Sequence, residues 1–176
     1  MGEFLMYEEL TKAMTLLGSD PRTIFLGQTV EYSGSGMYDT LKGVPMDKRL
    51  EVGIMEDTQL GMSIGLSLEG YIPISIYPRF DFLILAMNQL VNHLDKISEM
   101  SNGEFNPKVI IRTAVGATEP LYPGIQHCSD YTSGFRDILK NVDVIKLDKA
   151  EDVVESYKCA LNSDRSSLLI EVSNAS

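Results

Sequence analysis

Glu56 is the side chain of this sequence whose neighbours best suit it to do chemistry. It follows the apolar run Leu50–Met55 and opens a segment of small and apolar residues, Asp57–Gly65. This pattern predicts a parallel strand that leads into a helix. The carboxylate then lies at the carboxyl edge of an α/β sheet, where such folds bind ligands. The alternative is an ordinary acidic residue in the first turn of a helix, favoured there by the helix dipole.

Strands and helices are predicted to alternate along the whole chain. The predicted strands cover 23–26, 50–54, 71–77, 108–115, 142–147 and 168–172, and the predicted helices cover 7–17, 58–68, 80–100, 132–139 and 150–161. This order implies right-handed crossovers and an α/β fold, a mostly parallel sheet with helices on both faces. No repeat or linker interrupts it, so we expect a single domain over residues 1–176.

The composition argues against several classes of partner. A chain of 176 residues with 44% hydrophobic and 23% charged residues can bury a core of its own. The net charge of −10 and the absence of a basic stripe argue against nucleic acid and anionic membranes. The longest apolar runs are strand-sized, and the N-terminus has no signal-peptide pattern. Cys128 and Cys159 lack metal-ligand spacing, which predicts a reducing cytoplasm and no disulfide framework.

Several short tracts, read together, carry a resemblance over nearly the whole chain. They are Gly27–Val30, Ile54–Glu56, Gly61–Gly65, Phe80–Phe82, Asn88–Asn92, Val109–Thr113 and Gly124–His127. In this order and spacing the chain resembles the pyrimidine-binding (Pyr) domain of thiamine diphosphate enzymes. It is most similar to the beta subunits of 2-oxo acid dehydrogenases and to the central domain of transketolase.

The resemblance implies roles for three side chains. The family's cofactor reacts through an ylide at its thiazolium carbon, which the protein generates and orients. Glu56 matches a buried Glu that hydrogen-bonds a ring nitrogen of the aminopyrimidine and so favours the imino tautomer that removes the thiazolium proton. Phe82 matches an aromatic residue that stacks on the pyrimidine ring. His127 matches a His near the substrate channel that serves proton transfer or substrate orientation.

Some of these positions also have ordinary structural alternatives. Phe82 could be a core residue at the start of a helix, the role we expect for Phe80, and His127 could be a surface loop residue. The Gly61 and Gly65 spacing predicts a helix that another element approaches closely, and in the family this helix packs near the subunit junction. Met62, like Met87 and Met100, is expected to be core filler.

The chain departs from the family pattern at Gln28, where an acidic residue is common. Losing that charge is expected to change which substrates the channel accepts. Arg79, Lys108 and Arg112 could bind a phosphate or a carboxylate, although a lone Arg is usually a surface ion-pairing residue. The sequence therefore leaves two predicted substrate classes, a 2-oxo acid and a ketose.

The sequence contains no Gly-Asp-Gly motif, which in the family belongs to the diphosphate-binding domain and helps to hold Mg²⁺. We therefore expect no metal site in this chain and no activity from it alone. A separate Gly-Asp-Gly subunit would hold Mg²⁺ and share thiamine diphosphate across the junction of a hetero-oligomer, a heterotetramer for example. One alternative is that the chain is an excised domain, and another is a non-catalytic Pyr-like module that binds or regulates a partner.

Overall fold

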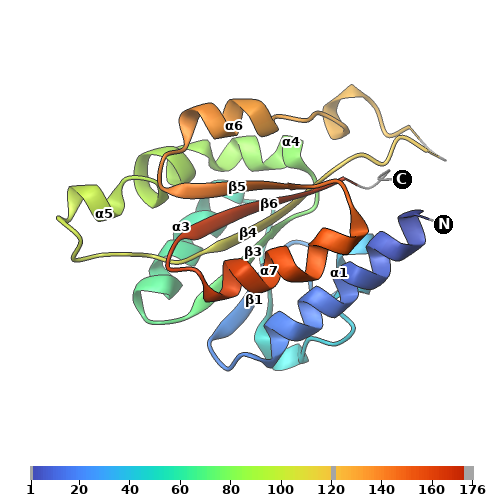
Figure 1. Cartoon of the computed structure of the whole chain (residues 1–176), viewed down its shortest axis with the longest axis horizontal. Coiled ribbons are helices and arrows are strands. Elements are labelled where there is room, and N and C mark those ends of the chain that lie inside the picture. Colours follow the sequence, from blue (N-terminus) through green and yellow to red (C-terminus); the bar gives the residue numbers. More distant parts are fainter. Residues whose placement is uncertain (1, 120–121, 173–176) are drawn as a thin grey trace.

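The computed structural model describes residues 2–119 and 122–172, with side chains from residue 5 onward, and forms one parallel sheet. The six strands lie in the order β2-β1-β3-β4-β6-β5, and every neighbouring pair is parallel (Figure 1). This confirms the predicted α/β class. The strands are β1 (Thr23–Gly27), β2 (Arg49–Glu51), β3 (Ile72–Tyr77), β4 (Ile110–Val115), β5 (Val142–Leu147) and β6 (Ser166–Val172).

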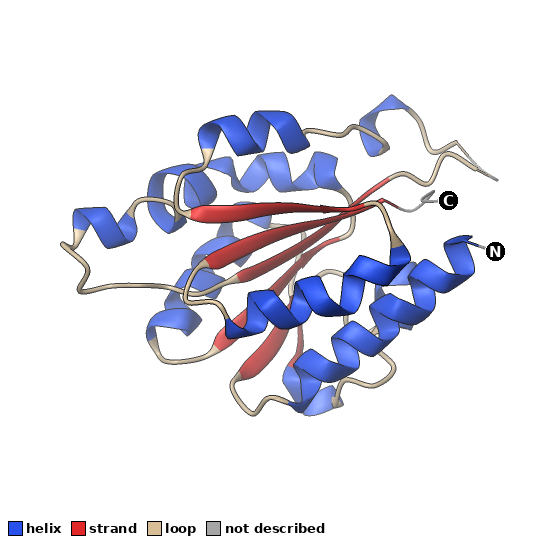
Figure 2. Cartoon of the chain, viewed as in Figure 1, coloured by secondary structure: helices blue, strands red, loops and turns tan. Residues whose placement is uncertain are grey.

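Helices cover both faces of the sheet, as the alternating pattern predicts (Figure 2). One face carries α1 (Gly2–Ser19), α2 (Gly36–Thr40) and α7 (Val153–Asn162). The other carries α3 (Glu56–Leu68), α4 (Phe80–Leu83) and α6 (Thr132–Ile138). Because successive side chains of a strand point to opposite faces, Ile110 joins one core cluster and Ile111 the other. The central strands are therefore mainly apolar and buried on both sides.

The second strand is shorter than predicted, ending at Glu51 rather than at Ile54. Its neighbour β1 ends at Gly27, which pairs with Glu51, so no ladder partner exists for the residues beyond. Ile54 is 80% exposed in the connection that leads to Glu56. Gly27 itself is required by close packing, because a Cβ there would lie 2.4 Å from the carbonyl oxygen of Ile76.

The long helix predicted over residues 80–100 is a chain of shorter helical segments. α4 is followed by a 3₁₀ turn, η2 (Ile84–Ala86), a π-helical segment, η3 (Asn88–Leu94), and α5 (Ile97–Met100). Asp95 directly follows the π segment, and its carboxylate accepts the backbone N–H groups of Lys140 and Asn141. The segment is helical over most of its length, as the apolar spacing indicated, but it does not keep the regular hydrogen bonding of a single α-helix.

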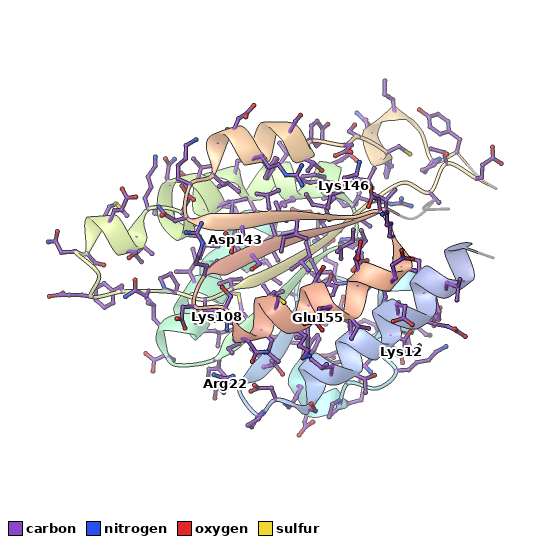
Figure 3. The ribbon with its side chains drawn as sticks, viewed as in Figure 1. Lys12, Arg22, Lys108, Asp143, Lys146 and Glu155 are labelled. Atoms are coloured by element: carbon purple, nitrogen blue, oxygen red, sulfur yellow. The ribbon has the colours of Figure 1, made fainter. Side chains whose placement is uncertain are left out.

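Charged side chains lie mainly on the outside of the molecule, where Lys12 projects from α1, Glu155 from α7 and Arg22 from the turn between α1 and β1 (Figure 3). Within the described ranges, no helix combines the length and the apolar character that crossing a bilayer requires. The predicted helices do not include α2 or the 3₁₀ turns η1 (Met46–Lys48) and η4 (Ile125–His127). The 3₁₀ turn η5 (Ala150–Asp152) lies at the start of the helix predicted over 150–161.

Candidate functional site

The carboxyl edge of the sheet brings together the connections that carry the predicted site residues. Gln28 follows β1, Glu56 follows β2, Phe82 follows β3, and His127 lies in the connection after β4. Because all these strands are parallel, their carboxyl ends share one edge, which is where open α/β sheets bind ligands.

Glu56 is the first residue of α3, and it is buried, with 5% of its surface exposed. Its carboxylate accepts one long hydrogen bond, 3.4 Å from Gln28 Nε2 to Oε1. Its backbone carbonyl accepts the Tyr77 hydroxyl at 3.3 Å, and burial raises the pKa of Tyr77 far enough to keep that donor protonated. Among the described residues, none donates a hydrogen bond to Oε2 of Glu56. The side chain as a whole is buried, but Oε2 is not among the buried atoms that lack a partner, so this oxygen can be reached from outside and is open to a ligand that donates to it.

Phe82 and His127 lie against each other, with ring centroids 5.5 Å apart and planes at 84°. Both side chains are half-buried, and His127 Nδ1 is buried without a partner in the described part of the chain. Asp81, beside Phe82 on α4, links α4 to the segment that follows His127. Its carboxylate accepts hydrogen bonds from the Ser129 amide and the Tyr131 hydroxyl. No ring contact or hydrogen bond between described residues joins this pair to Glu56. Phe80, by contrast, is fully buried beside Tyr131 and Phe135, as predicted.

Glu51 holds the connection that carries Gln28, a role that the sequence did not reveal. Its carboxylate accepts the backbone N–H groups of Thr29, Val30 and Glu31 at 2.7, 2.7 and 3.0 Å. Thr29 has a positive φ of 59°, a conformation that costs energy outside glycine and needs support from its surroundings. By fixing this turn, Glu51 sets the position of the Gln28 amide against Glu56.

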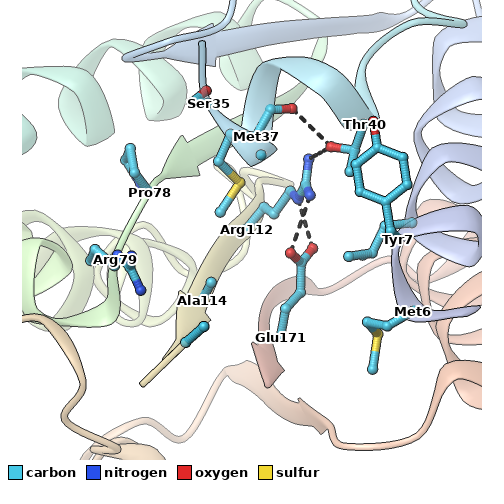
Figure 4. Close-up of a pocket in the computed structure, with 13 residues that line it drawn as sticks. Met6, Tyr7, Ser35, Met37, Thr40, Pro78, Arg79, Arg112, Ala114 and Glu171 are labelled. Carbon is cyan, nitrogen blue, oxygen red and sulfur yellow. Dashed lines mark hydrogen bonds and ion pairs between the residues drawn. The ribbon is translucent and has the colours of Figure 1, made fainter. Parts of the chain in front are cut away.

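Arg112 is fully buried rather than the surface ion-pairing residue that a lone Arg usually is. Its Nε and Nη2 donate to the two oxygens of Glu171 at 2.6 and 3.1 Å, and Nη1 donates to Thr40 at 2.9 Å (Figure 4). Burial lowers the pKa of Arg112, but the carboxylate of Glu171 and the hydroxyl of Tyr157 outweigh it and hold the pKa above its ordinary value. The pair joins β4 to β6 through a buried ion pair.

The outer face of α3 is open within the described part of the chain. A Cβ on Gly61 would only touch Gln89 at 3.6 Å, and a Cβ on Gly65 would meet nothing within 4 Å, so no described element packs tightly there, and packing near a subunit junction stays a prediction. Met62 is 40% exposed, so its prediction as core filler is wrong. Met100 is also exposed, whereas Met87 packs against the core as expected.

The described residues contain no set of three His, Cys, Asp or Glu side chains that could hold a metal ion. Lys108 does not share a site with Arg79 and Arg112. Lys108 Nζ donates to the Leu161 carbonyl at the far end of β4, whereas Arg79 and Arg112 line a cavity at the carboxyl edge.

Comparison with curated proteins finds relatives with one shared description. The chain is 30% identical over 143 residues to the pyruvate dehydrogenase E1 component subunit beta of Chaetosphaeridium globosum, covering 78% of the chain and 43% of that protein. It is 28% identical over 176 residues to the same subunit of Cyanidium caldarium, covering 97% of the chain and 53% of that protein. The chain is similar to pyruvate dehydrogenase E1 beta subunits. No family model matches it.

Solved structures of transketolases share the fold of this chain. A split-gene transketolase, described as an inactive beta4 tetramer, superposes with a TM-score of 0.71 at 20% identity, covering 94% of the chain and 50% of that one. A transketolase from Campylobacter jejuni gives a TM-score of 0.72 at 15% identity, covering 96% and 26%. The sequence and the fold together support a domain of the transketolase and 2-oxo acid dehydrogenase beta type.

The E1 beta relatives are longer proteins than this chain, which spans about half the length of those that it matches. The activity of the whole relatives is therefore a proposal for this chain. Those relatives are named as subunits and include chloroplastic and mitochondrial forms, so a cytoplasmic location stays a prediction.

Proposed function

We propose that this chain is the Pyr-domain subunit of a split thiamine diphosphate enzyme that cleaves or forms a carbon–carbon bond on a 2-oxo acid or a ketose. The observation that carries the proposal is the buried carboxylate of Glu56, which has one oxygen without a donor among the described residues. It lies at the ligand-binding edge of a chain similar to E1 beta subunits.

The residues at this edge fit the aminopyrimidine half of the cofactor. Bound thiamine diphosphate supplies a thiazolium carbon that can become a nucleophile once its proton is removed. Glu56 would hydrogen-bond the pyrimidine ring and hold its reactive tautomer. Phe82 would stack on the ring and contribute about 0.5–1.5 kcal/mol beyond burial. His127, with Nδ1 buried and unpaired in the described ranges, would orient the substrate or move its proton.

The open face beside Glu56 suits a partner subunit. Ile54, Met55, Met62, Ile84 and Leu85 are all at least 40% exposed, and they lie on or beside the neighbouring elements α3 and η2. A group of exposed large apolar side chains is typical of a surface that another protein covers. The partner would be a chain with a Gly-Asp-Gly motif, which would hold the diphosphate and Mg²⁺.

Co-purification with a candidate Gly-Asp-Gly subunit tests the proposal. The pair should show thiamine diphosphate-dependent turnover of pyruvate or of a ketose phosphate, whereas neither chain should do so alone. Glu56→Ala should lower the turnover by about 10²–10⁴-fold, the usual contribution of a positioned proton-transfer group. The control is Glu69→Ala at the exposed end of the same helix, which should leave turnover unchanged.

Two outcomes would contradict parts of this proposal. Turnover undiminished in Glu56→Ala would remove the catalytic role of Glu56. Tight cofactor binding by the isolated chain would contradict the shared site. A pair that forms but turns over nothing, with or without cofactor, would instead favour the non-catalytic interaction module.

The roles of Phe82 and His127 can be separated in the same pair. Phe82→Leu should raise the Kd for thiamine diphosphate about two- to tenfold, because it removes only the stacking energy. His127→Asn should lower kcat and leave the Kd for the cofactor unchanged. Equal effects of both variants on the Kd would show that the two rings act as one structural unit.

A further inference from the structure

We propose that a cavity on the opposite face of the sheet from α3 binds a small monocarboxylate with an aliphatic chain. The cavity has a volume of about 440 Å³ and lies between α1, α2 and the carboxyl ends of β3, β4 and β6 (Figure 4). Its lining includes neither Glu56 nor Phe82 nor His127. The proposal therefore stands whether or not the chain works with thiamine diphosphate.

The walls of the cavity are mainly apolar. Met6 and Leu10 from α1, Met37 from α2, Ala114 from β4 and Pro78 from the connection after β3 line it, and Tyr7 adds an aromatic ring. A pocket of this size and lining binds the apolar body of a small molecule, while a few polar groups fix its orientation. The apolar walls thus predict a ligand with a hydrocarbon portion.

The charged groups of the cavity leave one positive charge without a counterion. Arg112 and Glu171 both line it and neutralise each other as a buried ion pair. Arg79 also lines it and is half-buried, and no described residue pairs with its guanidinium. Opposite charges within such a site stabilise each other more strongly than they do in water, so the unpaired Arg79 favours an anion.

A second group of donors lies beside this charge. A guanidinium has five N–H donors, and the described residues accept three of those of Arg112, two on Glu171 and one on Thr40, while the Tyr157 hydroxyl also lies within hydrogen-bonding reach and leaves at most two donors over. Arg112 is 1% exposed, so its remaining donors have no access to bulk water. Because buried donors normally find acceptors, these donors and Arg79 together suit a ligand oxygen.

The balance of charge favours a carboxylate over a phosphate. A monocarboxylate neutralises the single unpaired charge of Arg79, and its planar oxygens match the fork of a guanidinium. A dianionic phosphate would leave a net negative charge inside apolar walls, next to the carboxylate of Glu171, which is costly. The structure therefore favours a fatty-acid-like or branched-chain monocarboxylate over a phosphorylated ligand.

Titration of the full chain with sodium hexanoate, followed by amide chemical shifts, tests this proposal. Hexanoate should bind saturably and shift the amides of Ser35–Thr40, Arg79 and Ala114. Arg79→Gln should weaken this binding at least tenfold, whereas Arg79→Lys should retain part of it. The matched control is Arg136→Gln on α6, an exposed Arg outside the cavity, which should bind hexanoate like the wild type.

Two further ligands separate the contribution of the ligand's charge to binding from that of its shape. 1-Hexanol has the same chain without the carboxylate and should bind at least tenfold more weakly, and inorganic phosphate should not displace hexanoate. Equal hexanoate binding by Arg79→Gln, shifts confined to another region, or no saturable binding by the wild type would overturn the proposal. Phosphate that displaces hexanoate would overturn the choice of a carboxylate. Thermal melts of each variant show that the fold is intact.

Discussion

Two buried carboxylates at the same edge of the sheet differ in how many hydrogen-bond donors the described residues give them. Glu171 on β6 accepts three hydrogen bonds, two from Arg112 and one from Tyr157 at 2.7 Å. Glu56 on α3 accepts only one, at 3.4 Å from Gln28. Both are similarly buried, with 3% and 5% of their surface exposed. Burial alone therefore does not distinguish a structural carboxylate from one that could bind a ligand. The number of hydrogen-bond donors that the protein supplies to the carboxylate does.

The largest effect on stability is expected at the fully bonded carboxylate. Glu171→Gln should lower the free energy of unfolding by about 3–5 kcal/mol, because it leaves the buried charge of Arg112 without a partner. Chemical denaturation measures this loss, and Glu155→Gln on the exposed side of α7 is the control. A double change, Arg112→Met with Glu171→Leu, should recover most of the stability. A loss below about 1 kcal/mol for Glu171→Gln would contradict the structural role of the pair.

Glu51 is an intermediate case, a carboxylate that binds backbone rather than a side-chain cation. Glu51→Ala removes the acceptor of three N–H groups, and should cost about 1.5–3 kcal/mol because water reaches part of the turn. Hydrogen exchange at Thr29, Val30 and Glu31 should quicken as well. Asp47→Ala, at an exposed position just before β2, serves as the control. Unchanged exchange at these three amides would show that the turn does not depend on Glu51.

Glu56 should contribute little to stability although it is buried. Glu56→Gln removes a charge that has one long hydrogen bond, so the free energy of unfolding should change by no more than about 1 kcal/mol. The same denaturation experiment measures it beside Glu171→Gln. If the two variants lose comparable stability, Glu56 is a structural residue and the contrast between the two carboxylates fails.

The smallest effect is expected at the surface pair of Asp20 and Arg22, at the opposite end of β1. The hydrogen bonds from Arg22 lower the pKa of Asp20 from 3.8 to about 2. A lowered carboxyl pKa stabilises the fold at pH values above 3.8, and this stabilisation is lost as the pH falls toward about 2. Asp20→Asn should cost about 0–1 kcal/mol at neutral pH, and the difference from the wild type should vanish in acid. A difference that persists at pH ~2 would have another cause.

The sequence predicted the regular parts of the fold because local patterns determine them. The strand at Val142–Leu147 has the predicted bounds, since it is a β-branched run between turn residues. The second strand ended three residues early because its length depends on where β1 stops, which is a property of the neighbour. The irregular hydrogen bonding within 80–100 has no local signal in the apolar spacing, and the contacts of Asp95 with Lys140 and Asn141, just before β5, span more than 40 residues of sequence.

The candidate site was predictable only for residues whose role follows from position after a strand. Glu56 was proposed in this way, Phe82 and His127 through the resemblance of their tracts to the family, and all three assignments stay predictions. The partners that distinguish them were not visible, because Gln28, Tyr77 and Asp81 act across 28, 21 and 48 or more residues. The same separation concealed the Arg112–Glu171 pair, which lies 59 residues apart in the chain.

The most direct test of the role of Glu56 needs no knowledge of the substrate. In the reconstituted pair of subunits, exchange of the thiazolium proton of thiamine diphosphate with solvent deuterium reports activation of the cofactor alone. We expect rapid exchange with the wild-type chain and exchange about 10²–10⁴-fold slower with Glu56→Gln, at unchanged stability of the fold. Equally rapid exchange in both proteins would contradict the assignment of Glu56 as the activating carboxylate.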